Sequence, residues 1–320
     1  MSDIYFCYHK HTDYSLLDSC TDYKSYIDYE VELGHKATAF TEHGKPLGWV
    51  KKKQYCDEKG IKYIHGVECY LTESLENKVR DNFHTVLLAR NLEGVKEINA
   101  LISQSTDDKH FYYTNRVSFD EFFNLSNNVI KISACLASPL NELRKREMTG
   151  EEHMMFDKII SHYDYFEIQP LSNNKFLIDK GRVANEAELM DINRKIVALG
   201  KKQGKPVVAT CDAHYAEPAH AIYRQILMAG QGFKDVEDGT GLYLRTTDEM
   251  LAEFSYLGEE TARKVVIDNT NAIADMCDGD ILPVPKGKFP PKIDGAEETL
   301  RKTCMDKAHA MYGEPMPDRI

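Results

Sequence analysis

Long apolar runs are absent from this 320-residue sequence, and so are the features of a secreted protein. No stretch approaches the roughly 18 consecutive apolar residues of a membrane-spanning helix. The first residues, MSDIYFCYHKHTDYS, lack the basic start and apolar stretch of a secretory signal. With 42% hydrophobic and 28% charged residues, the chain can still bury a sizeable core. We therefore expect a protein of the cytoplasm that does not bind a membrane.

Closely spaced cysteine pairs are also missing. The eight cysteines include no CxxC pair, which favours free thiols or a lone metal ligand over a disulfide framework. Positive charge is in deficit, because 40 basic against 51 acidic residues give a net charge of −11. A domain that holds duplex DNA by its phosphates is usually basic. We thus predict that this chain alone is not the main DNA-holding surface, whereas its acidic clusters suit bound cations.

No internal repeat or low-complexity segment occurs, and short apolar runs instead alternate with helical patterns. The clearest amphipathic stretches are Leu92–Ser103 and Asn185–Gln203, and Gly204 ends the second. Such alternation predicts a parallel α/β architecture, and seven such units suit a closed or nearly closed barrel. Functional residues of such barrels gather at the C-terminal ends of the strands. The predicted strands are Ile4–Tyr8, Ala37–Thr41, Lys62–Leu71, His84–Ala89, Val129–Ser133, Tyr165–Gln169 and Pro206–Thr210.

The pattern changes after about Gly230. Two helices are predicted there, at Thr247–Phe254 and Glu259–Met276. The next stretch, Ile281–Gly295, is rich in proline, glycine and lysine and predicts a linker. A helical pattern returns at Glu297–Tyr312. The expected organisation is one domain over residues 1–280, followed by a linker and a helix over residues 281–320.

Residue types that bind metals stand at the boundaries of the predicted strands. Residues two apart in an extended segment point to the same face, so His9 and His11 can reach one ion. Asp212 and His214 have the same spacing after the last strand. Single residues of these types stand at or near other strand boundaries: Asp18, His43, Glu68, His84 and Cys135.

The joint placement of these residues carries the hypothesis, because each alone is a weak signal. A lone HxH pair is more often chance than a metal site, and a free cysteine is commonly a buried small hydrophobe. Mixed nitrogen, oxygen and sulfur ligands suit Zn, Mn or Fe better than Mg or Ca. Nine ligands exceed one tetrahedral ion, which implies two or three divalent ions. We interpret Glu42 not as a ligand but as a residue that lies behind the ligands and contacts them, or as a surface residue.

The other histidines serve as a control. All except His65 lie in helical or loop stretches without partners at short spacing, and His65, which precedes Gly66 and is closer to the site, is interpreted as structural or exposed. They are His35, His65, His110, His153, His162, His220 and His309.

Taken in order, the motifs resemble those of a known family. HKHTDYSLLDS resembles the opening motif HxHTxYSLLDG of bacterial DNA polymerase III alpha subunits, and FTEHGKPLGW resembles their TDHGNxxG motif. GVECYLT, HTVLLARN, SACLAS and ATCDAHY match the later motifs in order and spacing. The resembling region is the N-terminal PHP (polymerase and histidinol phosphatase) domain, and the resemblance covers the whole chain.

This resemblance implies a fold and a ligand set. The family's PHP domain is a distorted seven-stranded β/α barrel whose cleft holds up to three metal ions. Two departures, Glu42 for the usual aspartate and Ser19 for the usual glycine, do not fall on ligand positions. The tail, ETLRKTCMDKAHAMYGEPMPDRI, resembles the first helix of the polymerase palm, without the residues of nucleotidyl transfer. The implied ligands are His9, His11, Asp18, His43, Glu68, His84, Cys135, Asp212 and His214.

The resemblance also implies an activity. Clustered divalent ions activate water and hold phosphate oxygens, which favours phosphoester hydrolysis. Family members with an intact site resemble metal-dependent 3′–5′ exonucleases that proofread DNA, so we expect this activity, with Asp212 and His214 acting through bound metal. A metal-stabilised scaffold, a pyrophosphatase and a small-molecule phosphatase stay open as alternatives. The expected partners are a primer 3′ end and, through regions outside this chain, replicase subunits such as the sliding clamp.

Overall fold

The computed structural model describes residues 3–78, 82–140, 150–233, 241–282 and 287–320. The chain divides into two compact units, Met1–Pro283 and Val284–Ile320. Residues 287–320 of the second unit contain one helix, α12 (Ala296–Tyr312), which has no buried residue. Part of the predicted linker, residues 283–286, lies outside the described residues. In the described part of the chain, no helix is long and apolar enough to cross a membrane.

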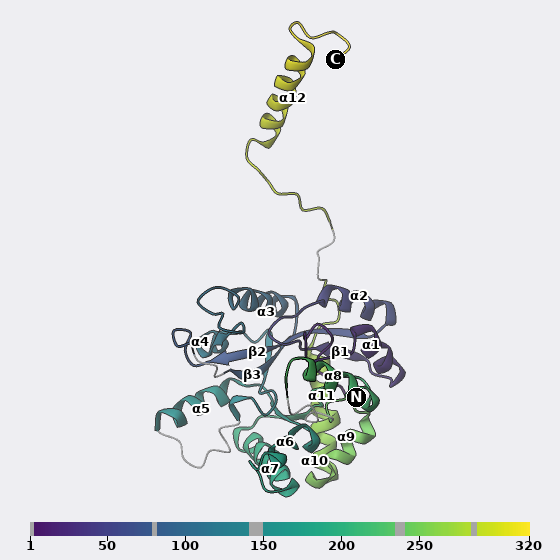
Figure 1. The fold of residues 1–320 in the computed structure, drawn as a ribbon, viewed down its shortest axis with the longest axis vertical. Coiled ribbons are helices and arrows are strands. Elements are labelled where there is room, and N and C mark those ends of the chain that lie inside the picture. The colour runs from purple at the N-terminus through teal and green to yellow at the C-terminus, as the bar shows by residue number, and fades with distance from the viewer. Residues whose placement is uncertain (1–2, 79–81, 141–149, 234–240, 283–286) are drawn as a thin grey trace. The chain divides into compact units, whose positions relative to one another are not determined.

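A mixed sheet forms the centre of the first unit (Figure 1). Its hydrogen-bonded order is β1–β2–β3–β5 with β4 beside β2, and β6 pairs separately with β7. The pairs β1–β2 and β6–β7 are parallel, but β3 is antiparallel to both of its neighbours. The all-parallel prediction is therefore wrong for β3. The strands are β1 (Ala37–Phe40), β2 (Lys62–Thr72), β3 (Phe83–Ala89), β4 (Val117–Ser118), β5 (Val129–Ile132), β6 (Phe166–Ile168) and β7 (Val207–Ala209).

Single bridges connect the two sheets. Ile132 at the end of β5 bridges to Tyr165 before β6, and Lys10 bridges to Ala213 beyond β7. The Thr41 backbone N–H, just after β1, donates to the Lys10 carbonyl at 2.9 Å. The fold is thus mixed α/β, and a closed barrel is not shown, because isolated bridges rather than strand ladders make these connections.

The first predicted strand is the one that does not form. Residues Ile4–Tyr8 belong to no strand, although Tyr5 to Tyr8 are buried. The Tyr5 N–H donates to the Thr247 hydroxyl at 2.9 Å, so a side chain takes the place of a neighbouring strand. The apolar composition of this segment is thus compatible with burial, whereas strand pairing depended on which partner the fold supplied.

Both faces of the main sheet are buried, which explains its nearly continuous apolar strands. Side chains alternate between the faces with a period of two. Along β3, Val86 and Leu88 belong to one buried cluster, whereas Leu87 and Ala89 belong to the other.

Local signals place the helices that surround these strands (Figure 1). The Asn185 side chain accepts the Glu188 N–H at the start of α7, and Gly204 ends that helix with a φ of 65°. The prediction of one helix at Glu259–Met276 misses a π-helical turn in its middle. The helices are α1 (Tyr23–Glu32), α2 (Trp49–Lys59), α3 (Leu92–Gln104), α4 (Phe119–Phe123), α5 (Gly150–His162), α6 (Phe176–Asp179), α7 (Glu186–Gln203), α8 (Ala221–Gly230), α9 (Thr247–Glu253), α10 (Glu259–Arg263), the π-helical turn (Lys264–Asp268) and α11 (Asn269–Met276), with short 3-10 turns at Leu171–Asn174, Pro218–His220 and Ser255–Leu257.

Candidate metal centre

The strand ends bring the predicted ligands to one edge of the sheets. His9 and His11 flank the bridged residue Lys10, and Asp212 and His214 flank its partner Ala213. β3 runs antiparallel to its neighbours, so its first residues lie at the edge where β5 ends. His84 at the start of β3 therefore meets Cys135, which follows β5, and the two side chains lie 3.5 Å apart.

Four buried side chains form what we call the deep group: His9, His11, Glu68 and Asp212. Their potential ligand atoms all lie within 4.8 Å of one another. His9 Nε2 is 2.9 Å from Glu68 Oε2 and 3.3 Å from Asp212 Oδ1. His11 Nε2 is 3.2 Å from the same Asp212 oxygen. The deep group thus offers two imidazole nitrogens and two carboxylates to one ion.

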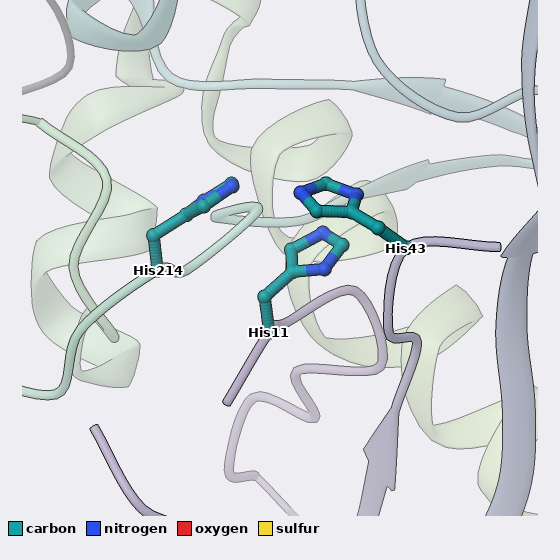
Figure 2. A group of neighbouring side chains, drawn as sticks. All are labelled: His11, His43 and His214. Atoms are coloured by element: carbon teal, nitrogen blue, oxygen red, sulfur yellow. The ribbon is translucent and has the colours of Figure 1, made fainter. Parts of the chain in front are cut away.

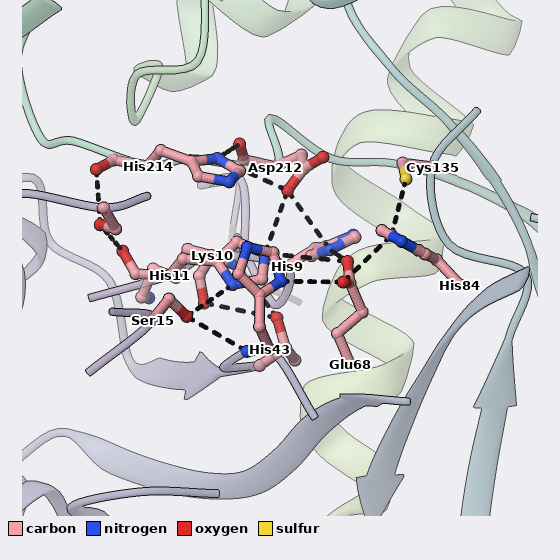
Figure 3. A network of polar contacts seen from close by, with 12 residues as sticks. His9, Lys10, His11, Ser15, His43, Glu68, His84, Cys135, Asp212 and His214 are labelled. Atoms are coloured by element: carbon pink, nitrogen blue, oxygen red, sulfur yellow. Dashed lines mark hydrogen bonds and ion pairs between the residues drawn. The ribbon is translucent and has the colours of Figure 1, made fainter. Parts of the chain in front are cut away.

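Glu68 belongs to a second cluster as well, the shallow group of Glu68, His84 and Cys135. Its Oε1 atom lies 3.1 Å from His84 Nδ1, while Oε2 faces His9 (Figure 3). The His84 side chain is 25% exposed, whereas that of Glu68 is 1% exposed. One carboxylate therefore joins the buried part of the site to a part that solvent reaches.

Three imidazoles form the histidine group of His11, His43 and His214 (Figure 2). The His11 and His43 rings stack with centroids 4.0 Å apart. Asp18 lies beside this group, because its Oδ2 is 3.0 Å from His43 Nε2 and 3.3 Å from His214 Nε2. The structure thus brings all nine sequence-predicted residues together. That they bind ions stays a prediction.

Two buried polar atoms in the deep group have no hydrogen-bond partner. They are His11 Nε2 and Asp212 Oδ1, which face each other across 3.2 Å. An unpaired buried polar atom costs about 1–3 kcal/mol. A divalent cation bound by both atoms would remove that cost, so the residues present fit a metal ion.

Neighbouring charges move several pKa values in the site. Burial opposes a charge on His43, but Glu68 and Asp18 raise its pKa to about 10. Burial, together with His43 and His214, lowers the pKa of His11 to about 3. Burial raises the pKa of Glu68, yet the adjacent histidines hold it well below its usual value. Protonated histidine therefore balances the carboxylates, and a bound cation would displace such protons.

Glu167 is a site residue that the sequence did not predict. This β6 carboxylate is buried, and its Oε1 lies 2.9 Å from His9 Nδ1. The Tyr8 hydroxyl donates to its other oxygen at 2.9 Å, and the Gln169 amide donates to Oε1 at 2.9 Å. A carboxylate on the far nitrogen orients a metal-binding histidine and makes it a stronger ligand. The available signal was an acidic residue inside an apolar strand, since buried charges need a partner.

Glu42 plays a corresponding part behind His11. It is buried rather than on the surface, and its carboxylate accepts hydrogen bonds from the Thr12 N–H at 3.0 Å and the Ser15 hydroxyl at 2.5 Å. The Ser15 oxygen lies 3.1 Å from His11 Nδ1, and Lys52 forms an ion pair with Glu42. Of the two positions offered for Glu42, the one behind the ligands is confirmed.

The second departure from the family motif also has a structural role. The Ser19 hydroxyl lies 2.7 Å from the His11 carbonyl and 2.6 Å from the His214 carbonyl. Glycine has no such group. Ser19 therefore links two chain segments that carry predicted ligands.

Unfavourable backbone conformations gather at the site. Leu17 and Ala134, which precede Asp18 and Cys135, have φ values of 67° and 56°. Asp212 itself has a φ of 50°. Side-chain-bearing residues rarely adopt positive φ, and such residues cluster at functional sites.

The other histidines do not join the site. His65 is buried and contacts the Asn99 side chain at 3.1 Å, which confirms the structural interpretation. For His110, the expectation of no nearby partner is wrong, because it lies 2.6 Å from Asp107, three residues earlier, and 2.8 Å from Glu121. Among the described residues, the metal-competent groups contain none of these other histidines.

Comparison with known proteins agrees with this geometry. The model of the PHP domain family matches residues 8–170, which is half of the chain. The chain belongs to the PHP domain family. It is 43% identical over 84% of its length to a DNA polymerase III PolC-type from Clostridium perfringens, and 41% identical over 90% to one from Caldanaerobacter subterraneus.

The chain spans only about a fifth of these relatives, 18% and 20% of their length. A solved structure from Bifidobacterium adolescentis aligns with 65% of this chain and 87% of its own at a TM-score of 0.44 and 12% identity. That structural likeness is too weak to support an inference about function.

Proposed function

We propose that this chain is the PHP portion of a PolC-type DNA polymerase III, and that its metal centre hydrolyses phosphodiester bonds at a DNA 3′ end. The similarity to PolC-type polymerases over most of the chain supports the first part. The observation that carries the second is the position of Glu68, whose two oxygens face different groups of potential ligands. Such sharing suits ions about 3.5–4 Å apart, the spacing of two-metal phosphoesterases.

Two or three ions of Zn, Mn or Fe fit the donor set, because it mixes imidazole, carboxylate and thiol. Such ions would supply an acidic bound water and neutralise phosphate charge. The deep group would hold one ion away from bulk water. Asp18, His43 and His84 are partly exposed, so an ion that they held would face the solvent side from which the phosphodiester enters.

The remaining functions of a replicase would belong to other regions. We assign residues 1–280 to the PHP domain and residues 281–320 to a linker and the first palm helix, so this chain should not incorporate nucleotides. Its net charge of −11 suggests that duplex DNA is held elsewhere in a longer cytoplasmic polymerase. We assign the sliding clamp to regions outside this chain as well.

The test is cleavage of a 3′-labelled single-stranded primer by the purified chain loaded with Mn or Zn. The decisive variant is Asp212→Asn, which keeps the shape but removes a charge. Loss of one ion should slow cleavage by about 100- to 1000-fold. Asp191→Asn is the matched control, because Asp191 is an exposed residue of α7.

Four outcomes separate the alternatives. Equal cleavage by the wild type and Asp212→Asn at matched metal content would remove Asp212 from the chemistry. A lower melting temperature in Asp212→Asn, with no metal-dependent cleavage in either protein, would favour the scaffold function. Hydrolysis of pyrophosphate but not of the primer would reassign the substrate, and uncut circular single-stranded DNA would identify an exonuclease.

A further inference from the structure

Arg224, a residue of α8, contacts one of the predicted ligands directly. The Arg224 Nε–H donates to the Asp18 carbonyl oxygen at 3.1 Å, and an Nη2–H donates to Asp18 Oδ1. The other carboxylate oxygen of Asp18 faces His43 and His214. Arg224 therefore stands against the side of Asp18 that points away from the histidine group.

In the described part of the chain, no other lysine or arginine side chain forms a hydrogen bond or ion pair with any of the nine predicted ligands. Two buried lysines, Lys10 and Lys52, form ion pairs with Glu30 and Glu42 instead. Among the described lysines and arginines, Arg224 is thus the one placed to meet an incoming anion at this site.

Arg224 also lies on the accessible side of the site. Its side chain is 12% exposed and that of Asp18 is 28% exposed, whereas the His9 and His11 side chains are fully buried. α8 itself has no buried residue. It is joined to the site by the contact with Asp18, and the Gln231 side chain, just after the helix, donates to the Leu17 carbonyl. Solvent and substrate therefore reach the guanidinium from the same side as the partly exposed ligands.

A guanidinium has five N–H donors in a planar arrangement that matches two oxygens of a phosphate. Asp18 engages Nε and Nη2, which leaves donors that no described residue accepts. We propose that Arg224 uses these donors to bind a non-bridging phosphate oxygen of the substrate. The contact with Asp18 fixes the guanidinium in place before the substrate arrives. This inference rests on the proposed phosphodiester substrate and names the residue that recognises its charge.

The experiment measures binding without turnover. Thymidine 5′-monophosphate, the type of product that a 3′–5′ exonuclease releases, is titrated by calorimetry into the Mn-loaded chain. The variants are Arg224→Gln and Arg224→Lys, and the control is Arg194→Gln, because Arg194 contacts Tyr256 on a different part of the unit. Elemental analysis measures the metal content of each protein.

We expect Arg224→Gln to weaken nucleotide binding by about 10- to 100-fold at equal metal content, since a hydrogen bond to a charged group is lost. Arg224→Lys keeps the charge but not the planar pair of donors, so its nucleotide affinity should lie between those of the wild type and Arg224→Gln. Arg194→Gln should bind like the wild type.

Unchanged nucleotide affinity in Arg224→Gln would overturn the proposal, and so would a wild type that does not bind the nucleotide. If Arg224→Gln cannot be filled with Mn, Arg224→Lys decides, and wild-type affinity in that variant would leave Arg224 as a residue that only positions Asp18. Failure of the proposed function can be told apart from failure of this proposal. In that case Arg224 would still be needed for nucleotide binding, but the chain would not cleave the primer.

Discussion

The deep and shallow groups of the metal centre share Glu68 but differ in how the protein supports them. In the deep group, Glu167 holds the far nitrogen of His9, while Ser15 and Glu42 stand behind His11. In the shallow group, His84 and Cys135 are partly exposed and contact each other. The difference suggests that an ion in the deep group would be held firmly and an ion in the shallow group would exchange more readily. Hydrogen bonds to carboxylates behind them orient metal-binding histidines before the ion arrives, and among the described residues only the deep group of the two has such support.

Glu68→Gln should have the largest effect, since it weakens both groups at once. The amide keeps the size of the side chain but removes the shared negative charge. We expect primer cleavage to fall by about 100- to 1000-fold and metal content to fall with it. Elemental analysis and cleavage rates measure both, with the exposed Glu186→Gln as a control. Full metal content with normal cleavage would mean that Glu68 does not join the two groups.

Glu167→Gln should affect the deep group alone. The loss of a carboxylate behind a metal-binding histidine commonly weakens metal affinity by about 10- to 100-fold. Competition with a chelator of known affinity measures this change. If Glu167→Gln loses the most weakly bound ion instead of the most tightly bound one, the assignment of the tightly bound ion to the deep group with His9 is wrong.

Cys135→Ser should affect the shallow group and do so selectively. Burial raises the pKa of the Cys135 thiol well above its usual value, so a metal must displace its proton. Thiolate favours Zn over Mn, and we expect about tenfold weaker binding of one Zn with little change for Mn. Parallel titrations with the two metals compare these effects. Equal losses for both metals would argue against a bond from sulfur to the ion.

The smallest effect concerns pH and stability in the chelated protein. His43 has its pKa raised from 6.5 to about 10, so its stabilising contribution is complete below pH 6.5 and is lost as the pH rises toward 10. Each kcal/mol lost lowers the melting temperature of a domain this size by about 2–4 °C. In strong chelator, the melting temperature of the wild type should therefore fall more steeply with rising pH than that of His43→Gln.

Added metal should raise these melting temperatures by mass action and reduce their pH dependence above pH 6.5. Identical melts with and without chelator, after metal loss is confirmed by elemental analysis, would show that the ions do not stabilise the fold.

Much of the fold could be predicted because it depends on neighbours in sequence. α7 and α3 begin and end within one residue of their predicted ends, since periodicity and end caps are local signals. The direction of β3 was not predictable in this way, because an apolar strand reads alike in both directions. The π-helical turn at Lys264–Asp268 was missed for a related reason, since helical periodicity continues across it.

The sequence by itself determined the residue types of the site and their order along the chain. The HxH pair needs only extended backbone for both imidazoles to face one way, whereas Asp212 of the DxH pair has a φ of 50° and leaves the extended conformation. The bridge between Lys10 and Ala213 then places the two pairs next to each other. The tertiary structure alone decided that Glu68 faces two groups, that Glu167 supports His9, and that Arg224 reaches Asp18 from 206 residues away. These contacts join segments distant in sequence, and their geometry follows from how the whole core packs rather than from any local pattern.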